Sequence, residues 1–194
     1  MDSLSPSALF ALNAGQFRGA RPWGWLVTDG HEWQSPGLGP LGMAIVVDTG
    51  SRVTLVDAEH LPGVRRAGVA RQAFQSYPML LSAGVVPLAL REGGRGLDVS
   101  HRDSRLALGT IDDGRVLVAL TRFDALEGGL EEMPFGLTTP EMAAMMGGLG
   151  ARDAVMLDGG LSAQLAVREA DGSLRRYRGW RRVPLALVGR ARSE

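Results

Sequence analysis

Residues 154–164 of this chain combine the residue types of a polar ligand site. The first four, AVML, are apolar and form a run short enough for a buried strand. Asp158 follows directly, and then Gly159 and Gly160, which allow a close approach of backbone N–H groups to a ligand. Ser162 adds a hydroxyl donor. A polar site on a rigid strand fits this layout, and so does an ordinary Asp-Gly turn.

Two more polar residues far away in the sequence suit an anionic sugar. Arg105 stands at the start of a predicted strand, where a guanidinium either forms a rim salt bridge or binds a phosphate or carboxylate with two hydrogen bonds. The residue type alone favours the rim. Asn13 is the only asparagine, and its side chain suits a sugar hydroxyl or a turn.

A second carboxylate, Glu141, begins the strongest predicted helix, over residues 139–149. Thr138 or Thr139 is its expected N-cap, and Pro140 suits the first turn. The spacing of Thr138 and Glu141 also fits a capping box. Glu141 is therefore both a candidate catalytic acid and a candidate capping residue, and the capping role is preferred.

The composition excludes several kinds of chemistry. The chain has no cysteine, and all 21 of its basic residues are arginine, which a GC-rich genome would explain. Thiol nucleophiles, thiolate metal sites, Schiff-base lysines and the P-loop lysine are therefore absent. The three histidines are far apart, so a histidine metal site is not expected. We expect neither a cofactor nor a metal.

The charge pattern argues against nucleic acid. RRYRGWRR, residues 175–182, mixes five arginines with Tyr177 and Trp180, as in proteins that bind single strands. Against this interpretation, the net charge is zero and strand alternation would send the arginines to both faces. We expect no nucleic-acid partner.

The sequence gives no sign of a membrane-spanning segment or a signal peptide. It contains no run of 18 apolar residues, so we expect no membrane insertion. The N-terminus, MDSLSPSALF, does not resemble a signal peptide.

The predicted elements are about nine or ten short strands, many of them in hairpins. The turns Asp29-Gly30, Asp112-Asp113-Gly114 and Asp171-Gly172 mark three of these hairpins. A second helix is predicted within residues 61–74, and 91–100 and 127–137 are predicted loops. We expect one α+β domain over residues 1–194, a curved, mostly antiparallel sheet with one helix packed on it. If the strands flanking residues 139–149 are parallel, that helix forms a crossover.

These segments, taken in order, resemble the phosphodiester glycosidase family, whose members include the lysosomal uncovering enzyme. The similar segments are NAGQF (13–17), the hairpin at Asp29-Gly30, QSYPMLL (75–81), RLALGTIDDGR (105–115), GLTTPEMAAMM (136–146), DAVMLDGGLSA (153–163) and RRVPLALV (181–188). Each segment is weakly specific, but the ordered set covers most of the chain. The chain starts close to its Asn motif, so we expect the N-terminal part of the family domain to be reduced or missing.

The resemblance implies a hydrolase of the glycosidic bond in a sugar phosphodiester or a related anionic glycan, such as a bacterial exopolysaccharide. The implied cleft is lined by Asn13, Arg105, Asp158, Gly159, Gly160 and Ser162, with Gln75, Ser76, Thr138 and Glu141 nearby. Asp158 would act as general base or nucleophile, and Arg105 would hold the phosphate. An extracytoplasmic location is implied too, although this N-terminus does not support it. The oligomeric state is not predicted.

Three departures from the family pattern bear on the substrate. Gln16 follows Gly15 where the family has an aromatic pair, Leu161 follows the Asp-Gly-Gly turn, and Tyr77 places a bulky ring before Pro78. Tyr77 affects the expected sugar more than the reaction class. An alternative function uses the same cleft without catalysis: a binding module for anionic glycans or cell-envelope polymers.

Overall fold

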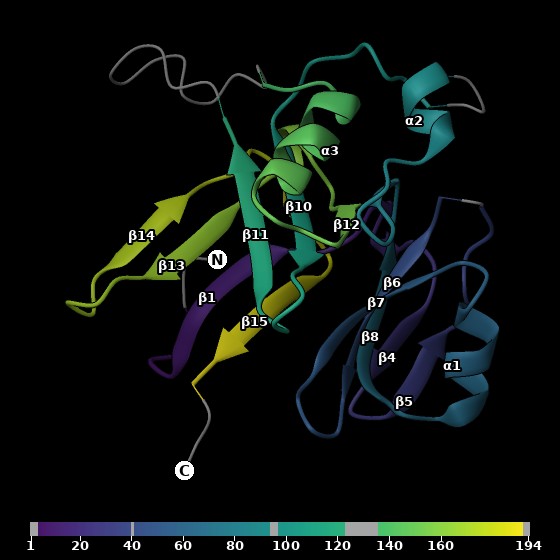
Figure 1. The fold of residues 1–194 in the computed structure, drawn as a ribbon. Helices are drawn as coiled ribbons and strands as arrows, with labels where there is room; N and C mark the ends of the chain where they lie inside the picture. The colour runs from purple at the N-terminus through teal and green to yellow at the C-terminus, as the bar shows by residue number, and fades with distance from the viewer. Residues whose placement is uncertain (1–3, 40, 94–96, 123–135, 192–194) are drawn as a thin grey trace.

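The computed structural model describes residues 4–39, 41–93, 97–122 and 136–191, and every strand pairing among them is antiparallel (Figure 1). One sheet has the order β14 (Leu174–Tyr177), β13 (Leu165–Arg168), β1 (Ala8–Asn13), β15 (Ala186–Arg190). A second has the order β11 (Val116–Thr121), β10 (Arg105–Thr110), β12 (Asp153–Met156), β9 (Met79–Leu81). The third has the order β5 (His31–Gln34), β4 (Leu26–Thr28), β8 (Ala70–Ser76), β6 (Met43–Asp48), β7 (Val53–Asp57). The short strands β2 (Phe17–Arg18) and β3 (Arg21–Pro22) pair with each other.

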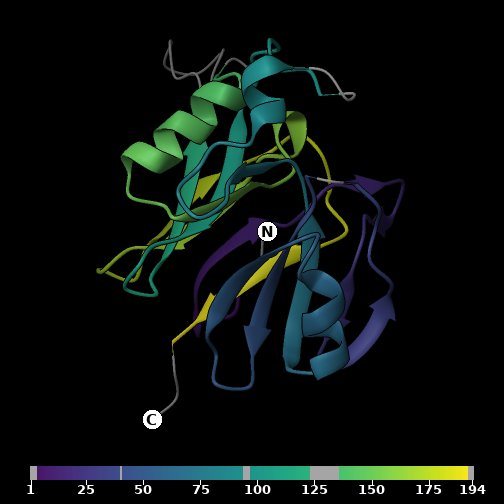
Figure 2. The same ribbon diagram turned by 45° about the vertical axis from the view of Figure 1, so that its right-hand side comes forward.

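Three helices and one 3-10 turn complete the described chain. They are α1 (Leu61–Ala67), α2 (Leu88–Glu92), α3 (Thr139–Gly148) and η1 (Gly160–Ser162). Figure 2 shows α1 on the sheet that contains β8, and α3 on the sheet that contains β10. The predicted α+β class with antiparallel sheets is confirmed, and the strands divide among several sheets.

The three larger sheets share one central core. Its members include Leu12 of β1, Ile45 of β6, Leu108 of β10 and Val155 of β12, all at most 1% exposed. Because successive strand residues point to opposite faces, Ala107 of β10 points the other way, into the cluster under α3. The sheets of β6 and β10 are thus covered on both faces, which explains their almost continuous apolar runs.

The strands beside the predicted crossover helix run parallel to each other. β11 and β12 both pair antiparallel with β10, which lies between them. α3 lies in the connection from β11 to β12 and packs on β9 and β10. The arrangement agrees with the predicted crossover. It places α3 over one face of the sheet that contains β12.

Two predicted elements differ from the structure. The helix predicted within residues 61–74 ends at Ala67, because Gly68 adopts the left-handed conformation with φ 63° and β8 follows at Ala70. The last strand lies at Ala186–Arg190 instead of 183–188, where it pairs with β1. Residues 94–96 and 127–135 of the two predicted loops lie outside the described residues. Among the described helices, none has the length and apolarity to cross a membrane.

Candidate active site

Asp158 lies immediately after the buried Leu157, and its backbone is bonded on several sides. The Leu157 N–H donates to Leu106 O of β10 (2.7 Å), and the Asp158 N–H donates to Ala14 O (3.1 Å). The side-chain amide of Asn13 donates to Asp158 O at 2.7 Å. The carboxylate is thus presented by a backbone that two separate segments, β10 and residues 13–14, hold in place.

The Asp158 carboxyl group is mostly buried and incompletely hydrogen-bonded. Its Oδ2 is inaccessible and accepts no hydrogen bond from the described residues. Burial raises the pKa of Asp158, a hydrogen bond from Ser162 and the charge of Arg181 oppose that rise, and the charge of Asp103 adds to it. A buried acceptor without a partner is uncommon in a folded protein, so this carboxyl group is an exception among the polar groups of the described residues.

The Gly159-Gly160 turn packs tightly against the segment before β10. The Gly160 N–H donates to Ser104 O at 2.8 Å, and a Cβ added at Gly159 would lie 2.7 Å from the same oxygen. A Cβ at Gly160, whose φ is +57°, would lie 2.6 Å from Asp103 Oδ2. Glycine is required here by protein neighbours, and the Gly160 N–H is already used within the chain.

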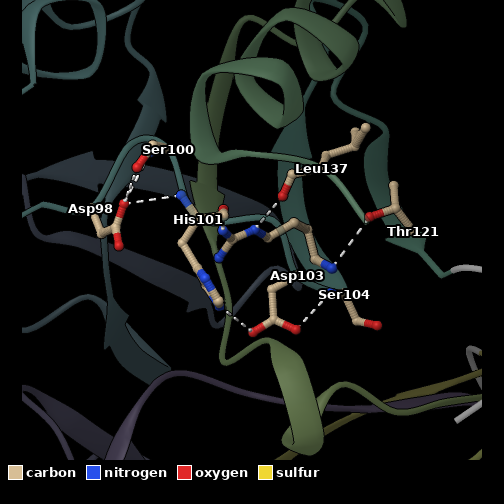
Figure 3. Close-up of polar contacts among 8 residues, drawn as sticks. Asp98, Ser100, His101, Asp103, Ser104, Thr121 and Leu137 are labelled. Atoms are coloured by element: carbon tan, nitrogen blue, oxygen red, sulfur yellow. Dashed lines mark hydrogen bonds and ion pairs between the residues drawn. The ribbon is translucent and has the colours of Figure 1, made fainter. Parts of the chain in front are cut away.

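Asp103 is a second carboxylate at the site, and the sequence analysis did not select it. Figure 3 shows its two oxygens between Ser104 and His101: Oδ1 accepts the Ser104 N–H (2.8 Å), and His101 Nε2 is 3.7 Å from Oδ2. Burial raises the pKa of Asp103, while Ser104, Arg105 and His101 act in the opposite direction. The signal that could have identified it is its position two residues before Arg105, on the same side of the extended chain.

Arg105 lies at this edge of the site and connects two loops. Its Nε donates to Leu137 O (2.8 Å) and its Nη2 to His101 O (2.6 Å), while its backbone N–H donates to the Thr121 hydroxyl at 3.2 Å. Burial lowers the pKa of Arg105, and the charges of Asp103 and Asp98 raise it. Among the described residues, two of the five guanidinium N–H groups have an acceptor in these bonds.

Arg181, also missed as a site residue, is the cation whose charge acts on Asp158. Its guanidinium carbon lies 5.1 Å from the centre of the Phe17 ring, a cation–π contact. Its backbone N–H donates to Leu161 O (3.0 Å), which fixes the loop before β15 beside the Asp158 turn. Arg181 therefore connects the Phe17 ring, through the cation–π contact, to the electrostatic environment of Asp158.

Asn13, Gln75 and Ser76 are fully buried and contact the chain itself. Asn13 Oδ1 accepts the Gln164 N–H (2.9 Å) opposite its bond to Asp158 O. Gln75 Oε1 accepts the N–H groups of Trp25 (3.1 Å) and Gly37 (2.8 Å). The Ser76 hydroxyl lies 2.6 Å from Met156 O and 2.9 Å from Gln16 Oε1. Their contacts within the chain are those of positioning residues.

Thr138 and Glu141 form the predicted capping box of α3. The Thr138 hydroxyl accepts the Glu141 N–H (3.3 Å), and Glu141 Oε2 accepts the Thr138 N–H (2.9 Å). Glu141 Oε1 also pairs with Arg102 Nη2 at 2.5 Å. The capping role is confirmed, and both carboxylate oxygens have partners.

The described residues contain no group of three histidine, cysteine or acidic residues that could hold a metal ion.

With this geometry in view, comparisons with known proteins identify the fold and the family. The sequence profile of the phosphodiester glycosidase family matches residues 7–188, so the chain belongs to that family. The zebrafish N-acetylglucosamine-1-phosphodiester alpha-N-acetylglucosaminidase catalytic domain, auto-inhibited by its pro-peptide, aligns with 96% of this chain at a TM-score of 0.72 and 18% identity. A hypothetical protein from Synechocystis aligns with 94% of it at a TM-score of 0.58 and 19% identity.

The present chain spans 64% of the zebrafish domain and 51% of the Synechocystis protein. At these identities the structural likeness concerns the fold. Among curated proteins, none matches the sequence significantly.

Proposed function

We propose that this protein hydrolyses the glycosidic bond of a sugar phosphodiester, with Asp158 as the reacting carboxylate. The observation that carries the proposal is the Asp158 carboxyl group itself. In a chain of the phosphodiester glycosidase family, it is a half-buried acid on a rigid strand end and beside a cation, with one buried oxygen that has no partner among the described residues. Its raised pKa makes the Asp158 carboxylate a stronger proton acceptor than an ordinary aspartate.

In the proposed reaction, water adds to the anomeric carbon as the bond from that carbon to the phosphate oxygen breaks. The phosphomonoester departs with this oxygen, and Asp158 accepts the proton of the attacking water. The alternative role is direct attack by Asp158, followed by hydrolysis of the glycosyl ester. The distance between the two carboxyl groups around the bound sugar decides between inversion and retention. A phosphate leaving group needs less protonation than a sugar alkoxide does.

The single negative charge of the phosphodiester would be held by Arg105 and Arg181. Within the described residues, only two of the five guanidinium N–H groups of Arg105 have acceptors, Leu137 O and His101 O, and arginine binds phosphate oxygens in pairs. Asp103 is proposed as the second carboxylate, which either positions water or protonates the departing oxygen. Asn13, Gln75 and Ser76 would position the backbone around the site, and Ser162 would orient Asp158.

The test is formation of p-nitrophenyl phosphate from a p-nitrophenyl sugar phosphodiester series in which the sugar is varied, read as p-nitrophenol after added alkaline phosphatase, with a control without phosphatase to exclude direct cleavage of the P–O bond to the nitrophenol. We expect turnover by the native chain and a loss of about 10²-fold or more for Asp158→Asn. Asp113→Asn, on the exposed β10–β11 turn, is the matched control and should keep native activity. Binding of the series with no turnover would replace the proposal with the non-catalytic glycan-binding alternative.

A further inference from the structure

A groove of about 630 Å³ lies on the outer face of the sheet β14-β13-β1-β15. Its floor follows one row of strand partners: Val188 pairs with Ala11, Ala11 with Ala166, and Ala166 with Arg176. In the neighbouring row, Leu12 belongs to the central core, and the partly buried Leu165 packs against that core and also borders the groove. Two alanines in the middle of the row leave a trough, and its volume lies in the range of small-molecule sites.

The walls of this groove are strongly basic. Arg176, Arg178, Arg181 and Arg182 line it, with Tyr177 and Trp180, while no aspartate or glutamate among the described residues does. Among the described residues, no carboxylate lies within ion-pair distance of Arg176 or Arg182. Four exposed guanidinium groups around the two central alanines attract a ligand with several negative charges.

The groove joins the site of Asp158 through shared residues. Gln164 lines the groove, and its side-chain amide donates to Ser162 O (3.3 Å) and Arg181 O (3.2 Å). Arg181 lines the groove and its charge also acts on Asp158. The loop that carries it follows the Asp158 turn, because the Trp180 and Arg181 N–H groups both donate to Leu161 O.

We propose that this groove binds the continuation of a polyanionic glycan beyond the bond at Asp158, so that the substrate is a chain of repeating phosphodiester-linked sugars. This inference rests on the proposed function. The groove is bounded and adjoins a reacting carboxylate, which favours a glycan chain. A nucleic acid would need a longer basic track, and the net charge of this chain is zero.

The experiment measures binding separately from turnover. Calorimetry at low salt compares a tetramer of mannose joined by three phosphodiesters with a mannose dimer that contains one, using chains that carry Asp158→Asn. We expect the tetramer to bind at least about tenfold more tightly than the dimer, since each added phosphate meets additional guanidinium groups. Arg176→Gln with Arg182→Gln should remove most of this difference and reduce the dependence of tetramer affinity on salt.

The matched control is Arg52→Gln with Arg66→Gln, which removes two exposed arginines on the five-stranded sheet side. This pair changes the net charge equally and should leave the tetramer affinity unchanged. Circular dichroism checks that each chain is folded. Equal weakening by both pairs, no preference for the tetramer, or tighter binding of oligo(dT) through the same arginines would each overturn the proposal. Failure to hydrolyse any phosphodiester would refute the proposed function and leave these affinities interpretable.

Discussion

The Asp103 carboxylate occupies the space where any residue other than glycine at position 160 would place its Cβ, 2.6 Å from Asp103 Oδ2. The acid before β10 and the turn after β12 therefore fit against each other directly. Their charges interact as well, because the negative charge of Asp103 raises the pKa of Asp158. The site therefore brings two carboxyl groups together, and the charge of Asp103 favours the protonated form of Asp158.

Replacing Asp103 by asparagine should shift the acidic limb of the activity profile to lower pH. The substitution removes a negative charge that favours the protonated form of Asp158, so the pKa of Asp158 falls. The measurement is kcat/KM against pH with the chromogenic phosphodiester. We also expect a drop of about 10²-fold or more if Asp103 transfers a proton. An acidic limb that stays in place would mean that the two carboxylates do not interact in the free enzyme.

Substitutions at Arg181 and Ser162 should shift the acidic limb of the pH profile to higher pH, opposite to the shift expected for Asp103→Asn. Both groups lower the pKa of Asp158, Ser162 through a hydrogen bond and Arg181 through its charge. Arg181→Gln and Ser162→Ala should therefore raise the pH at which activity is lost on acidification. Arg66→Gln, which removes a distant arginine, serves as the control for a general charge effect. A downward shift in either variant would contradict this account of the site.

The local features of this fold were predictable because short patterns encode them. The capping box of Thr138 and Glu141 needs four consecutive residues, and hairpins such as β10–β11 are marked by their turns. Asp158 stood out for the same reason, as a carboxylate after a short apolar run. The helix within residues 61–74 was overextended because Gly68 can end a helix or lie within one, and only the pairing of β8 with β6 decides.

The partners of Asp158 could not be predicted, since they depend on strand register. Ala107 of β10 pairs with Met156 of β12, and this register brings Asp103 and Ser104 against the turn at Gly160. Arg181 reaches the site only because the loop before β15 follows Leu161. No pattern within either segment specifies these long-range pairings.

Two departures from the family pattern become one feature in three dimensions. Gln16 Oε1 accepts the Tyr77 N–H (3.1 Å), and the Gln16 amide donates to Tyr77 O. The Tyr77 ring packs edge-on against Trp23, with centroids 4.8 Å apart. In the sequence, Gln16 and Tyr77 are two separate departures from the family pattern. In the structure, the Gln16 side chain holds the backbone of Tyr77, which carries the exposed aromatic ring. We therefore expect Gln16 and Tyr77 together to affect which sugar the protein accepts.

Replacing Asp158 by asparagine should stabilise the protein at neutral pH. The pKa of Asp158 is raised in the folded state, so its ionised form is disfavoured there, and its contribution to stability falls as pH rises through the folded pKa. Asparagine removes that penalty. We expect a higher Tm than native at pH 7 and no difference near pH 3, where the native carboxyl group is protonated in both states. Thermal unfolding at both pH values measures this.

Asp113→Asn provides the opposite case for the same measurement. A hydrogen bond from Arg115 lowers the pKa of Asp113, so this group stabilises the fold above its unfolded pKa and loses that effect as pH falls. The variant should have a slightly lower Tm than native at pH 7 and an equal one at low pH. If Asp158→Asn behaved in this way too, burial would not dominate the pKa of Asp158.

Paired substitutions separate the capping role of Glu141 from a catalytic one. Thr138→Ala removes the side chain that accepts the Glu141 N–H, and such a loss costs about 1 kcal/mol of stability, or roughly 2–4 °C in Tm. Glu141→Gln keeps an acceptor for the Thr138 N–H, since glutamine also completes a capping box. It should therefore retain both the fold and kcat to within about threefold. A catalytic carboxylate at position 141 would instead lose about 10²–10⁴-fold in kcat with its helix intact, and circular dichroism alongside the assay distinguishes the two results.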